Sequence, residues 1–173
     1  MSVADLCALG ASGLPPIADH ARLFLWRVAS MQEDALRVMR AWGFTQKSEI
    51  VWRKLTKTGK RHFGMGRTVR MEHEVCLVGT KGRPPILSRS VRSMFDTEIW
   101  IDDDPETGEP IGEFAAPYEF HSKKPDVFYE IVESLSPGPH VELFARQPRE
   151  RWTSIGEALG TRLSPIVRQA MGR

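Results

Sequence analysis

The sequence has few cysteines, no long apolar run and no linker-like segment. Cys7 and Cys76 are the only cysteines among 173 residues, which excludes a disulfide framework and favours free thiols in a reducing cytoplasm. No stretch reaches the ~18 consecutive apolar residues of a membrane helix. The first residues carry Asp5 without a Lys or Arg, unlike a signal peptide. We therefore expect a single cytoplasmic domain over residues 1–173 without membrane attachment.

The net charge of +2 hides an uneven distribution along the chain. Residues 1–86 hold 14 Lys or Arg and 7 Asp or Glu, whereas residues 87–173 hold 10 and 15. The first half is therefore at +7 and the second at −5. A basic half of this size predicts contact with a polyanion such as nucleic acid.

Strand-like apolar runs alternate with segments of helical spacing. Predicted strands cover residues 22–28, 49–53, 74–80, 98–101 and 140–145, and predicted helices cover residues 2–9, 32–42, 125–135 and a segment from Ser164. Ser2 and Asp5 have capping-box spacing, Gly10 is expected to close that first helix, and Gly43 is placed to end the second in a left-handed turn. The alternation predicts an α/β fold with a largely parallel sheet.

The segment 53–70, called here the basic segment, contains seven Lys or Arg and no acid. Cations in such a segment can neutralise phosphates, and an aromatic ring such as Phe63 or His62 can stack on an unpaired base. The alternative is a solvated, flexible surface loop. The residues predicted to contact nucleic acid are Lys54, Lys57, Lys60, Arg61, His62, Arg67 and Arg70.

Two acids at strand ends are further candidates. Glu142 lies near the end of a predicted strand, where α/β sheets bind ligands, and a carboxylate there can accept hydrogen bonds from ribose hydroxyls. The alternative for Glu142 is an exposed acid paired with Arg146. His73 and Glu74 begin another strand and are either an acid–base pair or a satisfied structural pair. No Cys/His spacing suits a zinc site, and no nucleophile elbow is present.

Several motifs occur in a recognisable order over about 130 residues. They are LFLW (23–26), AWGF (41–44), VWRK (51–54), TKTG (56–59), FGMG (63–66), EHEVCLVGTKGRPP (72–85), HSKKPD (121–126), LSPG (135–138), ELFAR (142–146) and Trp152. In these motifs the chain resembles the MT-A70 family of adenine-N6 methyltransferases. Its members transfer a methyl group from S-adenosylmethionine to the exocyclic amine of adenine in RNA or DNA. The resemblance implies a Rossmann-like methyltransferase sheet with helices on both faces.

The resemblance also implies roles for individual residues. Lys124 matches the lysine that holds the carboxylate of S-adenosylmethionine, and Ser122 and Glu74 match positions lining the same pocket. Glu142 and Arg146 match the pair around the ribose of that cofactor. These chemical types suit the implied roles, because a cation attracts a carboxylate and an acid accepts hydrogen bonds from a diol.

Two departures from the family pattern bear on activity. Glu157 stands where the family usually has an asparagine near the adenosine. The catalytic Asp-Pro-Pro-Trp motif occurs nowhere in the 173 residues, so no residue is assigned a catalytic role. The resemblance therefore implies an N-terminally incomplete domain that lacks its first catalytic-motif strand. One interpretation is that Met1 is an internal methionine taken as a start, or that the gene is a decayed remnant; the other is a non-catalytic relative.

Two functions follow from the resemblance. We expect an adenine-N6 methyltransferase of DNA or RNA that is inactive as this isolated chain. The alternative is a non-catalytic nucleic-acid-binding or scaffold subunit of a methyltransferase complex. A homodimer or a heterodimer is compatible with either function.

Overall fold

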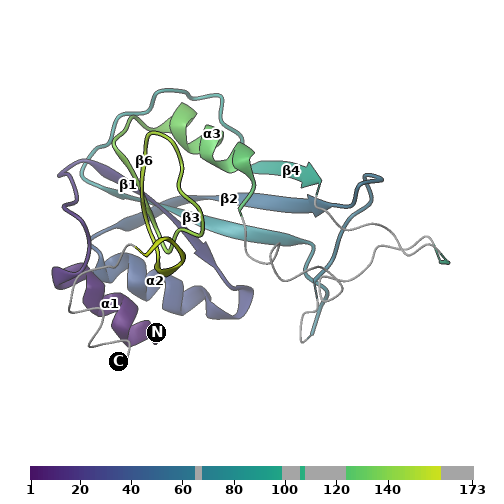
Figure 1. Ribbon diagram of the computed structural model, residues 1–173, viewed down its shortest axis with the longest axis horizontal. Coiled ribbons are helices and arrows are strands. Elements are labelled where there is room, and N and C mark those ends of the chain that lie inside the picture. The colour runs from purple at the N-terminus through teal and green to yellow at the C-terminus, as the bar shows by residue number, and fades with distance from the viewer. Residues whose placement is uncertain (65–67, 99–105, 108–123, 161–173) are drawn as a thin grey trace.

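A computed structural model describes residues 1–64, 68–98, 106–107 and 124–160 of the chain (Figure 1). It has helices and strands in mixed order, and the α/β class is confirmed. In chain order the elements are α1 (Val3–Ser12), β1 (Ala21–Arg27), the 3-10 turn η1 (Ala29–Met31), α2 (Gln32–Ala41), β2 (Thr45–Leu55), β3 (His73–Lys81), β4 (Met94–Glu98), α3 (Asp126–Leu135), β5 (His140–Leu143), β6 (Trp152–Ile155) and the 3-10 turn η4 (Glu157–Leu159).

The sheet is mixed, so the prediction of a largely parallel sheet is wrong. Four strands lie in the order β1-β3-β2-β4, and β3 runs antiparallel to both of its neighbours. Parallel pairing joins β2 to β4 and, in a separate two-stranded sheet, β5 to β6. The apolar run of β3 arises because this strand lies inside the sheet with helices on both faces, whatever its direction.

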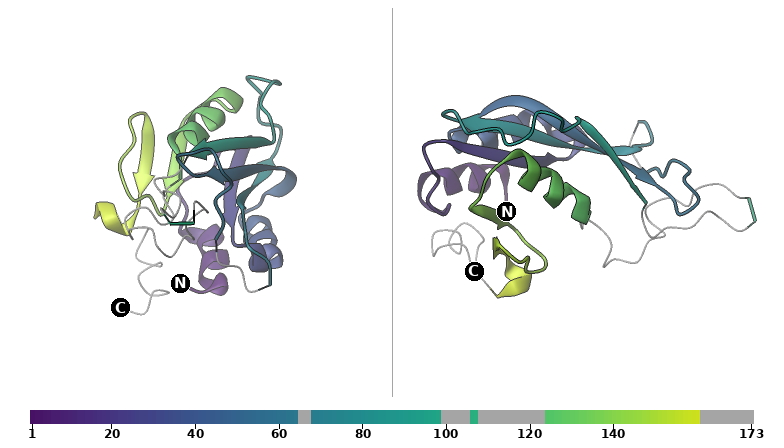
Figure 2. Two further views of the ribbon diagram at one scale, coloured as in Figure 1. Left: turned by 90° about the vertical axis from the view of Figure 1, so that its right-hand side faces the viewer. Right: turned by 90° about the horizontal axis from the view of Figure 1, so that it is seen from above.

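Helices cover both faces of the four-stranded sheet. Val75 and Leu77 of β3 pack with α1 and α2 on one face, while Cys76 and Val78 pack with Phe128 and Val132 of α3 on the other. Figures 1 and 2 show α1 and α2 on the side of the strands opposite to α3. Because successive side chains of a strand point to opposite faces, β3 supplies both cores.

The β5–β6 pair lies beside α3 and apart from the four-stranded sheet (Figure 2). After β5 the chain returns to β6 through Ala145, whose amide donates to the carbonyl of Ile155 at 3.0 Å. Gly156 follows, and a Cβ there would lie 1.9 Å from the carbonyl oxygen of Ala145. A glycine is therefore required where the two segments cross.

Local signals in the sequence were partly confirmed. The Ser2 and Asp5 side chains cap α1 reciprocally, and Gly43 follows α2 with φ +83°. The prediction that Gly10 ends α1 is wrong, because the helix continues to Ser12. A Cβ at Gly10 would lie 2.5 Å from the carbonyl oxygen of Ala41, so this glycine allows α1 to approach the end of α2.

The strands differ from prediction at two places. β6 was not predicted, since its four residues carry no clear alternation. β4 spans Met94–Glu98 and therefore begins before the predicted strand at 98–101, of which 99–101 lie outside the described residues. The sequence also predicts an acidic loop over residues 102–113, and this loop and the terminal helix from Ser164 lie outside the described residues, except for residues 106 and 107. Among the described helices, none has the length and hydropathy to cross a membrane.

Candidate functional site

Three charged side chains meet on the face of the sheet that α3 covers. Glu74 of β3 accepts from Lys54 of β2 at 2.8 Å through Oε1 and from Lys124, just before α3, through Oε2. The three side chains keep only 27%, 10% and 19% of their surface exposed. We call Lys54, Glu74 and Lys124 the charge cluster. It brings together two residues that the resemblance assigned to the cofactor and one that was predicted to contact nucleic acid.

Two indole rings line the charge cluster. The Lys124 ammonium lies 4.6 Å from the ring centroid of Trp26 and 5.7 Å from that of Trp52, and the Lys54 ammonium lies 5.0 Å from Trp52. The face of an indole attracts a cation, so the rings replace part of the water that the ammonium groups lose. Trp52 itself is fixed by a 2.7 Å hydrogen bond from its Nε1 to Oγ1 of Thr97.

The lysines keep Glu74 ionised despite its burial. Burial is the largest single influence on its pKa and would raise it, but Lys124 and Lys54 together outweigh burial and hold the pKa of Glu74 below its usual value. The cluster is therefore a fixed arrangement of two cations and one anion at neutral pH.

The basic segment is ordered by hydrogen bonds where the structure describes it. Lys54 accepts at its carbonyl from the amide of His62 at 3.0 Å, and Thr56 donates its amide to the carbonyl of Lys60 at 2.8 Å. Gly59 supplies the left-handed residue of the turn, with φ +80°. Backbone hydrogen bonds therefore give the described part of the segment a defined turn.

Two of the predicted nucleic-acid residues are not on the surface. Lys54 is 8% exposed and His62 is fully buried, so the expectation that Lys54 is an exposed loop cation is wrong, and the imidazole of His62 is not available for stacking on a base in this arrangement. The reason is that Lys54 still belongs to β2, where alternate side chains face α3. Charge and composition did not reveal this alternation.

Apart from Arg53, which is half-buried on β2 and pairs with Asp96, the remaining described cations of the basic segment are exposed. Lys57 and Lys60 lie on the turn, and Arg61 pairs loosely with Glu72 at 3.6 Å. The Arg70 guanidinium lies 4.3 Å from the ring centroid of Phe63. Arg67 lies outside the described residues. A polyanion can therefore reach the exposed cations of this segment and Phe63.

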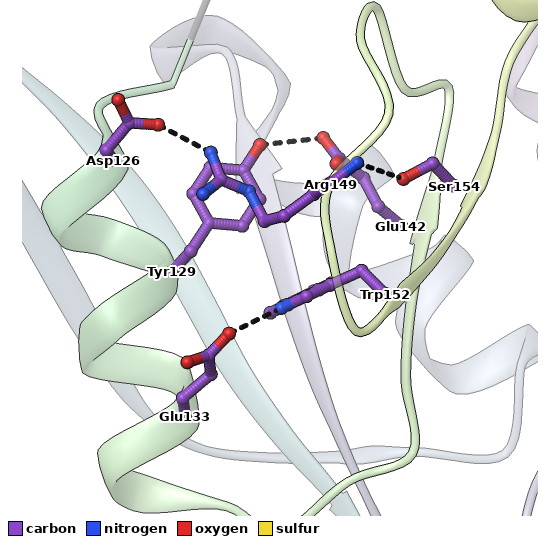
Figure 3. Close-up of polar contacts among 7 residues, drawn as sticks. All are labelled: Asp126, Tyr129, Glu133, Glu142, Arg149, Trp152 and Ser154. Atoms are coloured by element: carbon purple, nitrogen blue, oxygen red, sulfur yellow. Dashed lines mark hydrogen bonds and ion pairs between the residues drawn. The ribbon is translucent and has the colours of Figure 1, made fainter.

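A second polar group joins α3 to β5 (Figure 3). The hydroxyl of Tyr129 donates to Oε1 of Glu142 at 2.8 Å, and the guanidinium of Arg149 lies 3.6 Å from the centroid of the Tyr129 ring. Arg149 also pairs with Asp126 at 2.5 Å. We call Asp126, Tyr129, Glu142 and Arg149 the tyrosine network. Burial and the Glu142 carboxylate raise the pKa of Tyr129, so its hydroxyl stays a donor at neutral pH.

The surroundings of the tyrosine network are aromatic and open on one side. The Trp152 indole donates to Glu133 at 2.7 Å (Figure 3). The same indole stacks on the His140 ring, with ring centroids 4.6 Å apart. An open pocket of about 430 Å³ adjoins the network, and its lining includes Tyr129, Glu133 and Arg149. Glu142 itself is half-buried beside this pocket, behind its hydrogen bond to Tyr129.

The predicted cofactor residues thus fall into two groups. Glu74 and Lys124 lie in the charge cluster, and Glu142 lies in the tyrosine network, while Arg146 and Glu157 are exposed. Ser122 lies outside the described residues. Within the described residues, no group of His, Cys, Asp or Glu could hold a metal ion.

Sequence reasoning missed Tyr129, Arg149 and the indole rings of the charge cluster. The spacing of Asp126 and Tyr129, one turn apart on α3, was a signal for two side chains on the same side of that helix. No local signal marked Arg149, because its partners are contributed by α3.

Comparison with known proteins matches the chain to one family model and to several relatives with the same kind of name. The family model described as MT-A70 matches residues 5–158. A putative N(6)-adenosine-methyltransferase MT-A70-like protein of Medicago truncatula is 33% identical over 157 residues, covering 87% of this chain and 22% of the relative. The N(6)-adenosine-methyltransferase MT-A70-like protein of Drosophila melanogaster is 33% identical over 162 residues, covering 88% of this chain and 23% of the relative.

A human relative agrees with these two. The N(6)-adenosine-methyltransferase catalytic subunit METTL3 of Homo sapiens is 30% identical over 152 residues, which covers 84% of this chain and 23% of that protein. The chain thus spans between a fifth and a quarter of the length of these curated relatives. Because the family model covers most of the chain, from α1 to η4, this protein belongs to the MT-A70 family.

Proposed function

We propose that this chain forms the cofactor-binding part of an adenine-N6 methyltransferase that uses S-adenosylmethionine. The carrying observation is the position of Lys124, which lies against Glu74 of the central strand, just before α3. The family resemblance places the cofactor carboxylate at this lysine. We take the mixed sheet with helices on both faces as a methyltransferase sheet of the Rossmann-like type.

The residues of the chain suit this cofactor. Lys124 is a half-buried ammonium next to an indole, a strong partner for a carboxylate. Glu142 is half-buried and oriented by the Tyr129 hydroxyl, and a carboxylate at a strand end can accept hydrogen bonds from a ribose diol. Arg146 lies three residues beyond the end of β5 and is exposed. When bound, S-adenosylmethionine supplies the methyl group.

The test is binding of S-adenosylhomocysteine by calorimetry to the 173-residue chain. We expect Lys124→Met to weaken binding about ten- to a hundredfold, because it removes a charge-assisted hydrogen bond of ~1.5–3 kcal/mol. Lys47→Met is the matched control, since Lys47 is exposed on β2. Equal affinities of the two variants would overturn the proposal.

Glu157 tests the adenosine end of the same site. It is exposed at the start of η4, where the family usually has an asparagine. Glu157→Asn should tighten S-adenosylhomocysteine binding if this side chain faces the adenosine. Unchanged or weaker binding would mean that Glu157 points elsewhere.

We propose further that the exposed cations of the basic segment contact the nucleic acid. They are Lys57, Lys60, Arg61 and Arg70. The hydrogen-bonded turn over residues 54–62 supports the proposal because it holds the first three of these cations together. Contact with phosphates is salt-dependent and largely indifferent to sequence. If about three phosphates of a single strand are neutralised, log K against log salt should have a slope of about −2.

Removing the cations of this turn tests the second proposal. Changing Lys57, Lys60 and Arg61 together to Ala should weaken binding to a single-stranded oligonucleotide and flatten the slope. The control removes three exposed cations elsewhere, at Arg37, Arg40 and Lys47. If the two triple variants lose affinity equally, the basic segment is a solvated surface and nothing more.

A non-catalytic nucleic-acid-binding or scaffold role is the alternative, and the absence of Asp-Pro-Pro-Trp from these 173 residues favours it. Positioning the target amine and stabilising its developing charge account for most of this kind of chemistry. Labelled S-adenosylmethionine with DNA or RNA oligonucleotides should therefore give background incorporation with this chain alone. Incorporation well above that of Lys124→Met would show that the chain contains a catalytic group of its own. In that case, the oligonucleotide that takes up the labelled methyl group would show whether the target is DNA or RNA.

A further inference from the structure

The charge cluster carries one cation more than the binding of Glu74 to Lys124 needs. Lys124 and Glu74 alone form a neutral pair, and Lys54 on the neighbouring strand brings the three side chains to a formal charge of +1. Each carboxylate oxygen of Glu74 takes one lysine, Oε1 for Lys54 and Oε2 for Lys124. The arrangement is therefore more than a salt bridge that stabilises the fold.

We propose that Lys54 is a positioning residue that neutralises Glu74, so that the charge of Lys124 is available to the carboxylate at the amino-acid end of the cofactor. This inference rests on the proposed function. Without Lys54, a carboxylate that approached Lys124 would also meet the uncompensated charge of Glu74 a few ångströms away. At close range in a half-buried site, such repulsion is several times stronger than in water.

The fold fixes Lys54 in this position. Trp52 of β2 is paired in register with Glu74 of β3, and Lys54 lies two residues further along β2 on the same face. The Trp52 ring lies within 6 Å of both ammonium groups, so each lysine is held between an indole and the carboxylate. Lys54 thus acts through Glu74 and needs no contact with the cofactor itself.

Two ligands separate this role from a structural one. S-adenosylhomocysteine carries the amino-acid carboxylate, whereas 5′-deoxy-5′-methylthioadenosine has the same nucleoside without it. We expect Lys54→Met to weaken the binding of S-adenosylhomocysteine about tenfold in calorimetry. The affinity for methylthioadenosine should stay within about twofold of that of the parent chain, because this ligand has no carboxylate. A variant that merely disturbs the fold would weaken both ligands.

A charge-restoring double variant sharpens the test. Lys54→Met brings the cluster to zero, but Lys54→Met with Glu74→Gln returns it to +1, carried by Lys124 alone. We expect the double variant to recover S-adenosylhomocysteine affinity to within about threefold of the parent chain, although it removes one more native group. Methylthioadenosine binding and the circular dichroism spectrum report whether each variant is folded.

The outcomes distinguish the inference from the proposed function. If the parent chain binds neither ligand, the proposed function fails. If the parent binds S-adenosylhomocysteine but Lys54→Met weakens both ligands equally, or leaves both unchanged, the cofactor site stands and the role of Lys54 is wrong. Failure of the double variant to recover affinity while it still binds methylthioadenosine would also overturn the role of Lys54.

Discussion

The two faces of the central strand β3 perform different tasks. On one face, Val75 and Leu77 pack against α1 and α2 among mostly aliphatic side chains, with Trp42 and Phe44 as the buried aromatic residues. On the other, Glu74, Cys76 and Val78 share a side with α3, and the packing there is largely aromatic. The Phe128 ring, for example, lies 4.7 Å from that of Trp26, centroid to centroid.

The difference shows where this fold can carry charge. The buried residues that form the core of the α1–α2 face are all apolar, whereas the α3 face ends in the charge cluster. Indole and phenyl rings tolerate a neighbouring cation better than aliphatic groups do, since their faces attract it. The aromatic face therefore accommodates the candidate site, and the aliphatic face contributes stability.

The largest effect should come from the aliphatic face. Leu77 is 0% exposed, and Leu77→Ala should lower the free energy of unfolding by about 4 kcal/mol through lost transfer energy and the cavity left behind. Urea denaturation measures this change, with the exposed Val141→Ala on β5 as control at under about 0.5 kcal/mol. S-adenosylhomocysteine affinity of the folded variant should not change, and a selective loss of that affinity would contradict the division between the faces.

Glu74→Gln should affect the aromatic face almost as strongly. It leaves two ammonium groups close together in a half-buried site. We expect the free energy of unfolding to fall by about 3 kcal/mol, which is the lower end of the range for breaking a buried ion pair. The change is measured at pH 7 by urea denaturation. A loss below about 0.5 kcal/mol would mean that the lysines relax into solvent.

The same variant predicts a pH dependence. The pKa of Glu74 is lower in the folded chain than in the unfolded chain, chiefly because the lysines outweigh burial. Its contribution to stability is therefore complete above the unfolded value of about 4.3 and is lost as the pH falls below it. The difference between the parent and Glu74→Gln should shrink from pH 5 toward pH 3. A constant difference over that range would contradict the lowered pKa.

A smaller effect is expected in the tyrosine network. Tyr129→Phe removes the hydroxyl that donates to Glu142 at 2.8 Å. The free energy of unfolding should fall by about 1.5 kcal/mol, because the acceptor is charged and only half-buried. A double-mutant cycle with Glu142→Gln isolates the coupling between the two side chains. Additive losses in that cycle would show that the bond does not stabilise the fold.

The smallest effect should come from an exposed pair on α2. Arg40 and Glu33 pair at 2.7 Å with 60% and 80% of their side chains exposed, and Arg40→Ala should change the free energy of unfolding by less than about 0.5 kcal/mol. Measured beside Glu74→Gln, it shows how far burial multiplies the effect of one ion pair. A loss near that of Glu74→Gln would mean that exposure does not govern these pairs.

Much of the local structure was predictable because it depends on neighbouring residues. The α1 capping box, the left-handed Gly43 after α2 and the α3 helix follow from side chains a few positions apart. Gly10 was misjudged because its requirement comes from Ala41, which only packing brings near. β6 was missed because its pairing with β5 determines it more than its own residues do.

The sequence by itself determined the family, the mixed α/β class and most helix positions, since motif order and side-chain spacing are properties of the chain. It also nominated Glu74, Lys124 and Glu142. Only the tertiary structure decided that β3 lies between β1 and β2, because strand order and direction depend on long-range pairing that apolar patterning does not encode. That pairing puts Trp52 opposite Glu74, and it thereby makes Lys54 a buried partner of Glu74 instead of a surface cation.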